Sequence, residues 1–309
     1  MRELALLYYS RRMNNCQPAI LELPARAGRF LTLGLVHEAV VDAAAARLAT
    51  LKREGSLIVG LGDPFIRALG RSIDGLRPFP AVSGPGGAFP STQGAVWIFL
   101  GGDDPGEILH RARRVLAHLG DVFRVDEDVA SFVYGEGRDL SGFEDGTENP
   151  KEARAVAVAI AAGAAAGVAG SSFVATQRWI HDLTRFERLA QRDRNLIIGR
   201  DLASNEEIAD APASAHVKRA AQESYAPVAF MVRRSMPWGD VNQHGLYFVA
   251  YGATLDPFER VLRRMAGLDD GVPDALLRFT RPVTGGYFWC PPTLDGHLDL
   301  RALGVGIPK

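Results

Sequence analysis

Apolar residues gather in short, dense runs from about residue 29 onward, and stretches rich in Ala, Leu and charged residues separate these runs. The run 95–100 is apolar at every position, which is typical of a buried strand. The stretch 39–53 is rich in Ala and Leu and ends before Gly55, which indicates a helix. The whole pattern predicts strands at 29–36, 57–61, 95–100, 121–134, 172–180, 228–233, 246–251 and 278–288, and helices at 39–53, 105–119, 183–192 and 256–265.

Turn-forming residues mark the ends of these elements. Asp104 is placed to cap the helix 105–119, and Pro105 fits its first turn. A long connection rich in Pro and Gly covers 76–94. The segment 155–170 is uncharged, but it is shorter than a bilayer span and consists mostly of Ala and Gly. We therefore predict an interdomain strand and loop at 155–170.

The order of the elements predicts an α+β fold. The first half reads β-α-β twice, and the second half repeats this order without obvious sequence identity. A ferredoxin-like sandwich requires this order, with helices on one face of an antiparallel sheet. We predict two tandem ferredoxin-like domains, at 1–150 and 151–309, of the dimeric α+β barrel type with helices packed outside.

The composition indicates a globular protein. Of the 309 residues, 47% are hydrophobic and 23% are charged, and the net charge of -1 leaves no basic surface for nucleic acid or an anionic membrane. Cys16 and Cys290 have neither zinc-binding nor haem-attachment spacing, and they suit a reducing cytoplasm. Arg11 and Arg12 look like a twin-arginine export signal, but polar residues follow where an apolar core is needed, so we expect a surface pair.

The stretch Gly142-Phe143-Glu144-Asp145-Gly146-Thr147-Glu148-Asn149-Pro150 lies near the midpoint of the chain and predicts an ordered loop. Glycines before and after Asp145 allow positive φ and close approach. An acid on such a loop can point into a cavity and transfer protons. The residues alone fit an acidic surface turn equally well.

Two further positions are candidates for chemistry. His216 is flanked by small residues, which leave room for a flat group against the imidazole, although a histidine is more often structural than a ligand. Arg233 and Arg234 end a predicted strand, so alternation sends one guanidinium inward, where it needs an anion or a polarised ligand. Asp145 is one possible partner, in which case the two residues form a structural ion pair.

Taken together, these motifs resemble the dye-decolorizing haem peroxidases. Gly142-Phe143-Glu144-Asp145-Gly146 fits the GxxDG signature of that family. The similarity continues, in family order, through 173–183, 198–200, the His216 segment, Arg233-x-Ser235 and 278–285. It covers most of the chain after about residue 25. Without a long N-terminal extension, the sequence is most similar to the shorter bacterial, intracellular subgroup.

The resemblance implies a set of roles around a non-covalently bound haem b. His216 matches the axial iron ligand, Asp145 and Arg233 match the catalytic pair on the distal side, and Ser235 matches the polar residue beside them. Arg200 matches a partner of a haem propionate. Three further residues are expected nearby: Glu148 and Asn149 at the haem edge, and Asp274 as the carboxylate behind the axial imidazole.

The implied activity is reduction of hydrogen peroxide with oxidation of dyes, phenolics or another small-molecule reductant. Electrons can enter at the haem edge or through aromatic side chains, although aromatic residues in strands are usually core; those available are Trp179, Trp238, Trp289, Tyr247 and Tyr251. Alternative hypotheses are a protein that stores haem, transfers it or removes its iron, and a non-catalytic binding module. Homo-oligomers follow by family analogy, and the short C-terminal tail does not favour packaging into a protein shell.

Overall fold

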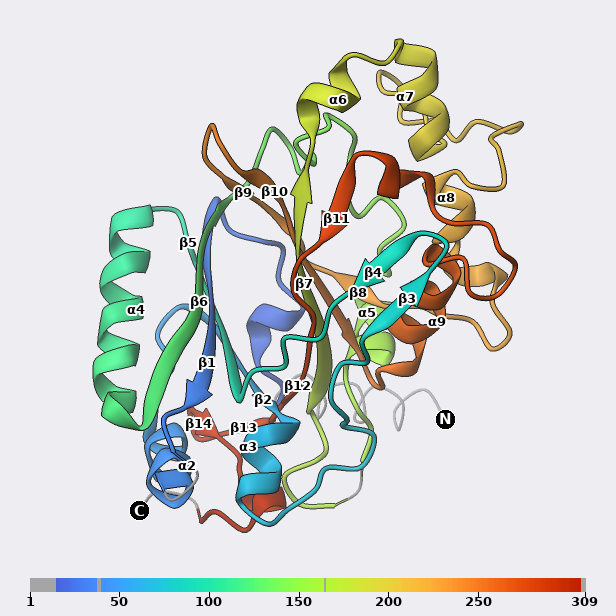
Figure 1. The fold of residues 1–309 in the computed structure, drawn as a ribbon. Coiled ribbons are helices and arrows are strands. Elements are labelled where there is room, and N and C mark those ends of the chain that lie inside the picture. The colour runs from blue at the N-terminus through green and yellow to red at the C-terminus, as the bar shows by residue number, and fades with distance from the viewer. Residues whose placement is uncertain (1–14, 38–39, 164, 307–309) are drawn as a thin grey trace.

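The computed structural model describes residues 15–37, 40–163 and 165–306 (Figure 1). The Arg11–Arg12 pair lies outside these residues. The helices are α2 (Val41–Thr50), α3 (Asp63–Ala68), α4 (Pro105–Leu119), α5 (Glu152–Ala159), α6 (Leu183–Glu187), α7 (Gln191–Ile198), α8 (His216–Arg219) and α9 (Asp256–Met265). The strands are β1 (Ala27–Leu35), β2 (Ser56–Gly62), β3 (Val82–Gly84), β4 (Gly87–Phe89), β5 (Val96–Gly102), β6 (Phe123–Phe132), β7 (Ser172–His181), β8 (Val232–Arg233), β9 (Met236–Gly239), β10 (His244–Gly252), β11 (Thr280–Pro282), β12 (Gly286–Cys290), β13 (Thr293–Leu294) and β14 (His297–Leu298).

A ten-stranded antiparallel sheet forms the centre of the molecule, in the order β11-β7-β12-β2-β5-β1-β6-β9-β10-β8. Strand β7 also pairs with β10, which closes the sheet into a barrel-like structure. The helices α2 and α4 pack outside this sheet on one side, and α8 and α9 pack outside it on the other (Figure 1). The predicted α+β class with antiparallel strands is confirmed.

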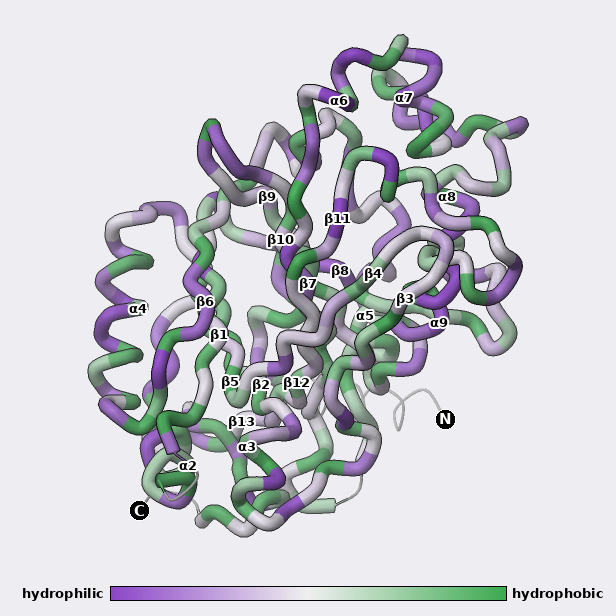
Figure 2. The backbone as a smooth tube through the Cα atoms, in the orientation of Figure 1, coloured by the Kyte–Doolittle hydropathy of each residue, from purple (hydrophilic) through white to green (hydrophobic). Residues whose placement is uncertain are grey.

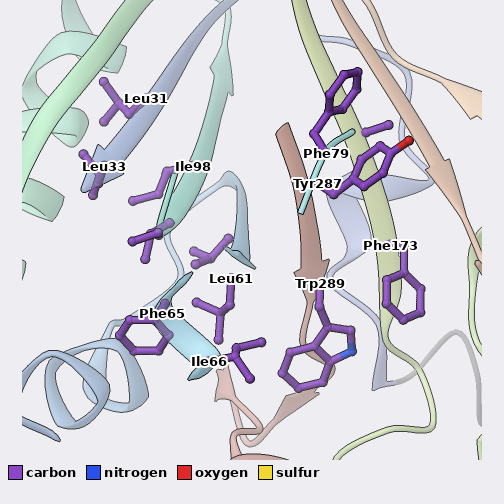
Figure 3. Packing of buried hydrophobic residues seen from close by; sticks show 14 of the residues in the cluster. Leu31, Leu33, Leu61, Phe65, Ile66, Phe79, Ile98, Phe173, Tyr287 and Trp289 are labelled. Atoms are coloured by element: carbon purple, nitrogen blue, oxygen red, sulfur yellow. The ribbon is translucent and has the colours of Figure 1, made fainter. Parts of the chain in front are cut away.

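Alternate residues of the strands point to opposite sides of the sheet. On β5, Trp97 and Phe99 point into the barrel, while Ile98 packs with the outer core shown in Figure 3. Contacts across the barrel confirm this assignment, because Phe30 on β1 stacks on Tyr247 on β10 with ring centroids 4.0 Å apart. Because both faces of β2, β5 and β12 are buried, these strands read as nearly continuous apolar runs, and Figure 2 shows hydrophobic positions along the strands.

The helix α4 begins as predicted. The Asp104 side chain accepts a hydrogen bond of 2.8 Å from the Glu107 amide, and Pro105 occupies the first turn. No helix in the described ranges is long and apolar enough to cross a bilayer.

Other predicted elements were wrong in part. Residues 155–159 belong to the helix α5 instead of a strand, because Ala is a strong helix former and Ala155, Val156 and Ala159 pack against the barrel interior. The helix predicted at 183–192 is divided into α6 and α7. Within 76–94 the strands β3 and β4 form a hairpin.

The strand predicted at 228–233 is reduced to Val232–Arg233. The preceding backbone instead bonds to Gln222: its carbonyl accepts from the Ala229 amide, and its side chain accepts from the Met231 amide, both at 2.8 Å. This segment therefore runs beside the α8 region before it enters the sheet.

Candidate active site

A cavity lies between the outer face of β7 and β10 and the helices α8 and α9, with about 1010 Å³ of space free of protein atoms, its mouth included. We call it the inner cavity. Most of its wall is apolar, and its polar groups come from β7, the central loop 142–150, α8 and β8. The residues that bear on the chemistry are Asp145, Gln177, Trp179, His181, His216 and Arg233.

His216 begins the short helix α8 and lines the inner cavity. Its Nδ1 lies 2.8 Å from Oδ2 of Asp274, whose side chain is fully buried. The other oxygen of Asp274 accepts a hydrogen bond of 2.9 Å from the Leu276 amide. Because an ionised carboxylate can only accept a hydrogen bond, Nδ1 of His216 carries the proton. Nε2 of the neutral ring then keeps its lone pair, which can bind a metal ion. The expected contact between His216 and Asp274 is present.

Hydrogen bonds join the last residue of α8 to the C-terminal end of α9 and to the loop that follows it. Arg219 is buried and forms two hydrogen bonds with the Asp270 carboxylate, at 2.6 and 2.8 Å, and a third with the Arg264 carbonyl at 2.6 Å. Gly199, with φ of 92°, ends α7 directly against α8, and a Cβ there would lie 2.3 Å from Cγ2 of Val217. These contacts fix the backbone that carries His216.

Replacing Asp270 with Asn is expected to lower the free energy of unfolding by about 1 kcal/mol, because buried Arg219 loses a charged partner while solvent screens the half-exposed carboxylate. The hydrogen bonds from Arg219 lower the pKa of Asp270 to about 2. Because this pKa lies below the unfolded value of about 3.9, the stabilisation is present above pH ~4 and is lost as the pH falls toward 2. Denaturant unfolding from pH 7 to 3 measures the difference between the two proteins.

The matched control is Asp269→Asn, because Asp269 and Arg263 form an exposed pair at 3.2 Å that is worth little. If the Asp270 variant were as stable as this control at pH 7, the anchoring of α8 by Arg219 would be contradicted.

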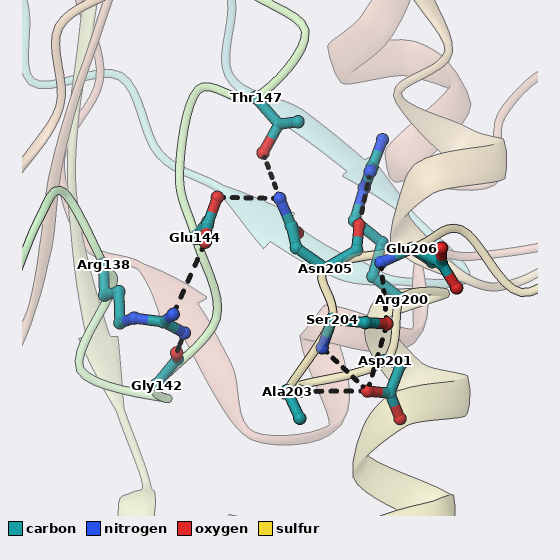
Figure 4. Close-up of polar contacts among 10 residues, drawn as sticks. All are labelled: Arg138, Gly142, Glu144, Thr147, Arg200, Asp201, Ala203, Ser204, Asn205 and Glu206. Carbon is teal, nitrogen blue, oxygen red and sulfur yellow. Dashed lines mark hydrogen bonds and ion pairs between the residues drawn. The ribbon is translucent and has the colours of Figure 1, made fainter.

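The central loop 142–150 contains neither helix nor strand, as predicted. Gly142 and Gly146 have φ of 90° and 81°, in the left-handed region that favours glycine. Figure 4 shows how neighbours hold Glu144: Arg138 from one side and Asn205 from the other, the latter with Nδ2 2.7 Å from Oε2 of Glu144. Asn205 also donates to Thr147 at 3.1 Å. The loop is therefore ordered through polar contacts on its outer side.

Asp145 and Arg233 both line the inner cavity. Nε of Arg233 is buried and has no hydrogen-bond partner among the residues described, and no ion pair joins it to Asp145 within them. The structural ion pair is therefore not formed. Arg234 points the other way and donates to the carbonyls of Leu21 and Glu22 at 2.9 and 2.6 Å. Strand alternation thus predicted one inward arginine, and it is Arg233.

A second, outer cavity lies on the other side of this pair. Asp145, Arg233 and Leu246 line both cavities and so form the wall between them. Ser235 lines only the outer cavity, where its Oγ accepts a hydrogen bond of 3.3 Å from the Val249 amide. Because that oxygen acts as an acceptor, its own proton is available for donation.

The strand β7 carries polar residues that the sequence analysis did not assign to the site. Gln177, Trp179 and His181 alternate along β7, and all three line the inner cavity. Nε2 of Gln177 and Nε1 of Trp179 are buried without a hydrogen-bond partner in the described chain. Such orphaned donors are expected where a polar ligand binds. Their spacing of two residues along a predicted strand is the sequence feature that could have placed their side chains on one face.

His181 is held by hydrogen bonds from both ring nitrogens. Its Nδ1 lies 2.6 Å from Oγ1 of Thr280, and its Nε2 lies 3.0 Å from Oδ1 of Asp139. Burial tends to raise the pKa of Asp139, but hydrogen bonds from His181 and Ser141 outweigh it and lower this pKa below its usual value. The pair therefore favours an ionised carboxylate at the cavity wall.

Three residues expected near the cofactor do not line the inner cavity, namely Arg200, Glu148 and Asn149. Arg200 pairs with Glu148 at 2.8 Å and donates to the Asn205 carbonyl at 2.9 Å, and neither Arg200 nor Glu148 lines the inner cavity. Asn149 contacts the Arg233 backbone. The contact of Arg200 with a propionate, and of Glu148 and Asn149 with the haem edge, stay predictions. The five aromatic side chains considered for electron entry are all buried.

A carboxylate-backed imidazole, an acid and an arginine whose Nε is unbonded line one cavity of this antiparallel α+β barrel, an arrangement that suits a peroxidase. The sequence profile described as "Dyp-type peroxidase, C-terminal" matches residues 136–295. The chain is 31% identical to the dye-decolorizing peroxidase of Mycobacterium tuberculosis over 297 residues, which cover 90% of this chain and 88% of that protein. The chain therefore belongs to the dye-decolorizing peroxidase family.

Solved structures agree with this assignment. A dye-decolorizing protein from V. cholerae superposes with a TM-score of 0.78 at 32% identity, covering 89% of this chain and 99% of that one. A variant of DypB from Rhodococcus jostii RHA1, in complex with heme, gives a TM-score of 0.80 at 28% identity, covering 88% and 95%.

Proposed function

We propose that this peroxidase uses non-covalently bound haem b, with His216 as the axial ligand and with Asp145 and Arg233 acting on hydrogen peroxide at the opposite face. The observation that carries the proposal is the pair of His216 and fully buried Asp274, 2.8 Å apart, on the wall of the inner cavity. The heme complex of DypB, whose structure resembles this chain, supports the choice of cofactor.

The residues present fit this cofactor. In the described part of the chain, no three His, Cys, Asp or Glu side chains are grouped to hold a metal ion. A metal bound by His216 must therefore bring its other ligands, as porphyrin iron does. Phe248, Phe258 and Leu262 supply apolar walls, and the orphaned nitrogens of Gln177 and Arg233 are donors for polar groups of the ligand.

The bound haem supplies the redox chemistry, and the protein positions it and moves protons. The Asp145 carboxylate accepts the proton of one peroxide oxygen and delivers it to the other, so that the second oxygen leaves as water. The Arg233 guanidinium donates hydrogen bonds to the negative charge that develops as the O–O bond breaks. Ser235 is available to donate a hydrogen bond from the outer cavity.

On the His216 side of the inner cavity, the Asp274 carboxylate accepts a hydrogen bond from Nδ1 of His216. This contact orients the ring and gives it imidazolate character, which makes Nε2 a stronger donor to a metal. Burial of Asp274 and its second hydrogen bond to the Leu276 amide keep the carboxylate in place.

The finer architecture also forms part of the proposal. The first half runs β1-α2-β2-β5-α4-β6 with the strand order β2-β5-β1-β6, which supports a ferredoxin-like domain over 1–150. We place a second, haem-binding domain at 151–309. A cytoplasmic homo-oligomer with a small-molecule reductant completes the proposal, and a protein shell is not favoured.

Absorption spectra of the purified protein test this function. We expect a Soret band after expression with ample haem, a spectral change on one equivalent of peroxide, and oxidation of a dye or phenol that requires peroxide. Free protoporphyrin without peroxide-dependent oxidation would instead identify a haem-handling protein. A colourless protein would contradict the cofactor.

A further inference from the structure

The side chain of Asn149 joins the central loop to the backbone of Arg233. Its Nδ2 donates to the Arg233 carbonyl at 3.0 Å, and its Oδ1 accepts from the Arg233 amide at 2.8 Å. One amide side chain thus bonds to both backbone groups of one residue, 84 positions away in the sequence. The Arg233 carbonyl also accepts a hydrogen bond of 3.0 Å from Nη1 of Arg234, whereas the Arg233 amide bonds to Asn149.

This contact takes the place of a neighbouring strand. β8 lies at the end of the sheet and pairs with β10 only on one side, where Arg233 is opposite Ala250. The next residue makes the ladder bond, from the Arg234 amide to the Val249 carbonyl at 2.9 Å. The amide and carbonyl of Arg233 bond instead to Asn149, whose side chain is planar like a peptide group.

Asn149 belongs to the same tight turn as Asp145. The Asn149 amide donates to the Gly146 carbonyl at 2.9 Å, and a Cβ on Gly146 would lie 2.7 Å from Nδ2 of Asn149. Asp145 directly precedes that glycine, so one short loop both carries the acid and holds the arginine backbone.

We propose that Asn149 is a positioning residue that sets Arg233 against Asp145 in the wall between the inner and outer cavities. The proposal rests on the role of Arg233 given above. Without the Asn149 amide, the backbone of Arg233 loses two fixed bonds at a sheet edge, and the guanidinium loses its orientation toward the ligand. Small misplacements of a catalytic group cost about 100-fold in rate.

The test is a double-mutant cycle on the haem-loaded protein with Asn149→Ala and Arg233→Leu. Two quantities are measured: fluoride affinity, which reports on a hydrogen-bond donor above the haem, and kcat/KM for peroxide. We expect Asn149→Ala to lower both by about 10- to 100-fold. Because Asn149 acts through Arg233, the double variant is expected to match Arg233→Leu alone.

The matched control is Asn205→Gly. Asn205 holds the same loop through Glu144 and Thr147 without touching Arg233, and glycine accepts its positive φ of 57°. The fluoride affinity of Asn205→Gly is expected to stay within about twofold of the wild-type value, because the contacts of Asn205 with Glu144 and Thr147 do not involve Arg233. A merely structural Asn149 would lower the unfolding temperature and leave fluoride affinity unchanged.

The outcomes separate the two proposals. If Arg233→Leu changes neither quantity, the role of Arg233 fails, and the positioning role fails with it. If Arg233→Leu has its effect but Asn149→Ala leaves both quantities at wild-type values, only the positioning role is overturned. Multiplicative effects in the double variant also overturn it, because Asn149 would then act independently of Arg233.

Discussion

Replacing His216 with alanine is expected to abolish stable haem binding, with an affinity at least ~100-fold weaker and no normal Soret band. The imidazole is the protein's axial ligand in the proposed site, and Asp274 at 2.8 Å strengthens it as a donor. The apolar walls of the inner cavity cannot replace a metal–ligand bond. Titration of the apoprotein with haem, followed by absorbance, measures the affinity.

Two further variants keep this prediction decisive if the alanine protein is unstable. His216→Gly leaves space for free imidazole, whose addition is expected to restore the Soret band. Asp274→Asn keeps the shape of the side chain but weakens the acceptor, so the protein is expected to retain haem with a shifted spectrum. A wild-type Soret band and haem affinity in His216→Ala would exclude His216 as the ligand.

Asp145→Ala is expected to lower kcat/KM for peroxide by about 10²- to 10⁴-fold, the usual contribution of a general acid–base group. Arg233→Leu is expected to lower it by about 10²- to 10³-fold, as the removal of one preorganised donor does. The two variants differ in a second property. Arg233→Leu also weakens fluoride binding, whereas Asp145→Ala leaves the arginine donor in place.

The control for Arg233 is Arg234→Leu, which removes the adjacent guanidinium outside the inner cavity. Arg234 donates to the carbonyls of Leu21 and Glu22, and its Nη1 also donates to the Arg233 carbonyl at 3.0 Å. Asn149 still holds both backbone groups of Arg233 in this variant, so the loss of Arg234 is expected to affect stability and to change kcat/KM by less than about threefold. Wild-type peroxide kinetics in both Asp145→Ala and Arg233→Leu would refute the roles assigned to these residues.

Features that depend on local pattern were predictable from the sequence. Asp104 caps α4 because its spacing to Pro105 and Glu107 is local. The inward direction of one of two adjacent arginines follows from strand alternation alone. The pairing of His216 with Asp274 came from the family resemblance, since 58 residues separate them.

Features that depend on tertiary contacts were not predictable. Nothing local shows that Asn149 meets the Arg233 backbone or that Arg200 pairs with Glu148, because these contacts join segments far apart in the chain. The orientation of Gln177 required the register of β7 against β10, where it lies opposite Phe248. The helix α5 was missed because an uncharged Ala and Gly segment gives no periodic signal.

The two strands outside the closed part of the sheet, β11 and β8, also bear on aggregation. Exposed edge strands can pair with the edges of other molecules. At one end, β11 is only three residues long and contains Pro282, which has no amide proton to donate. At the other end, Asn149 occupies the backbone groups of Arg233 on the free side of β8. The loop that carries Asp145 thus also occupies backbone groups of β8 that could otherwise pair with another chain.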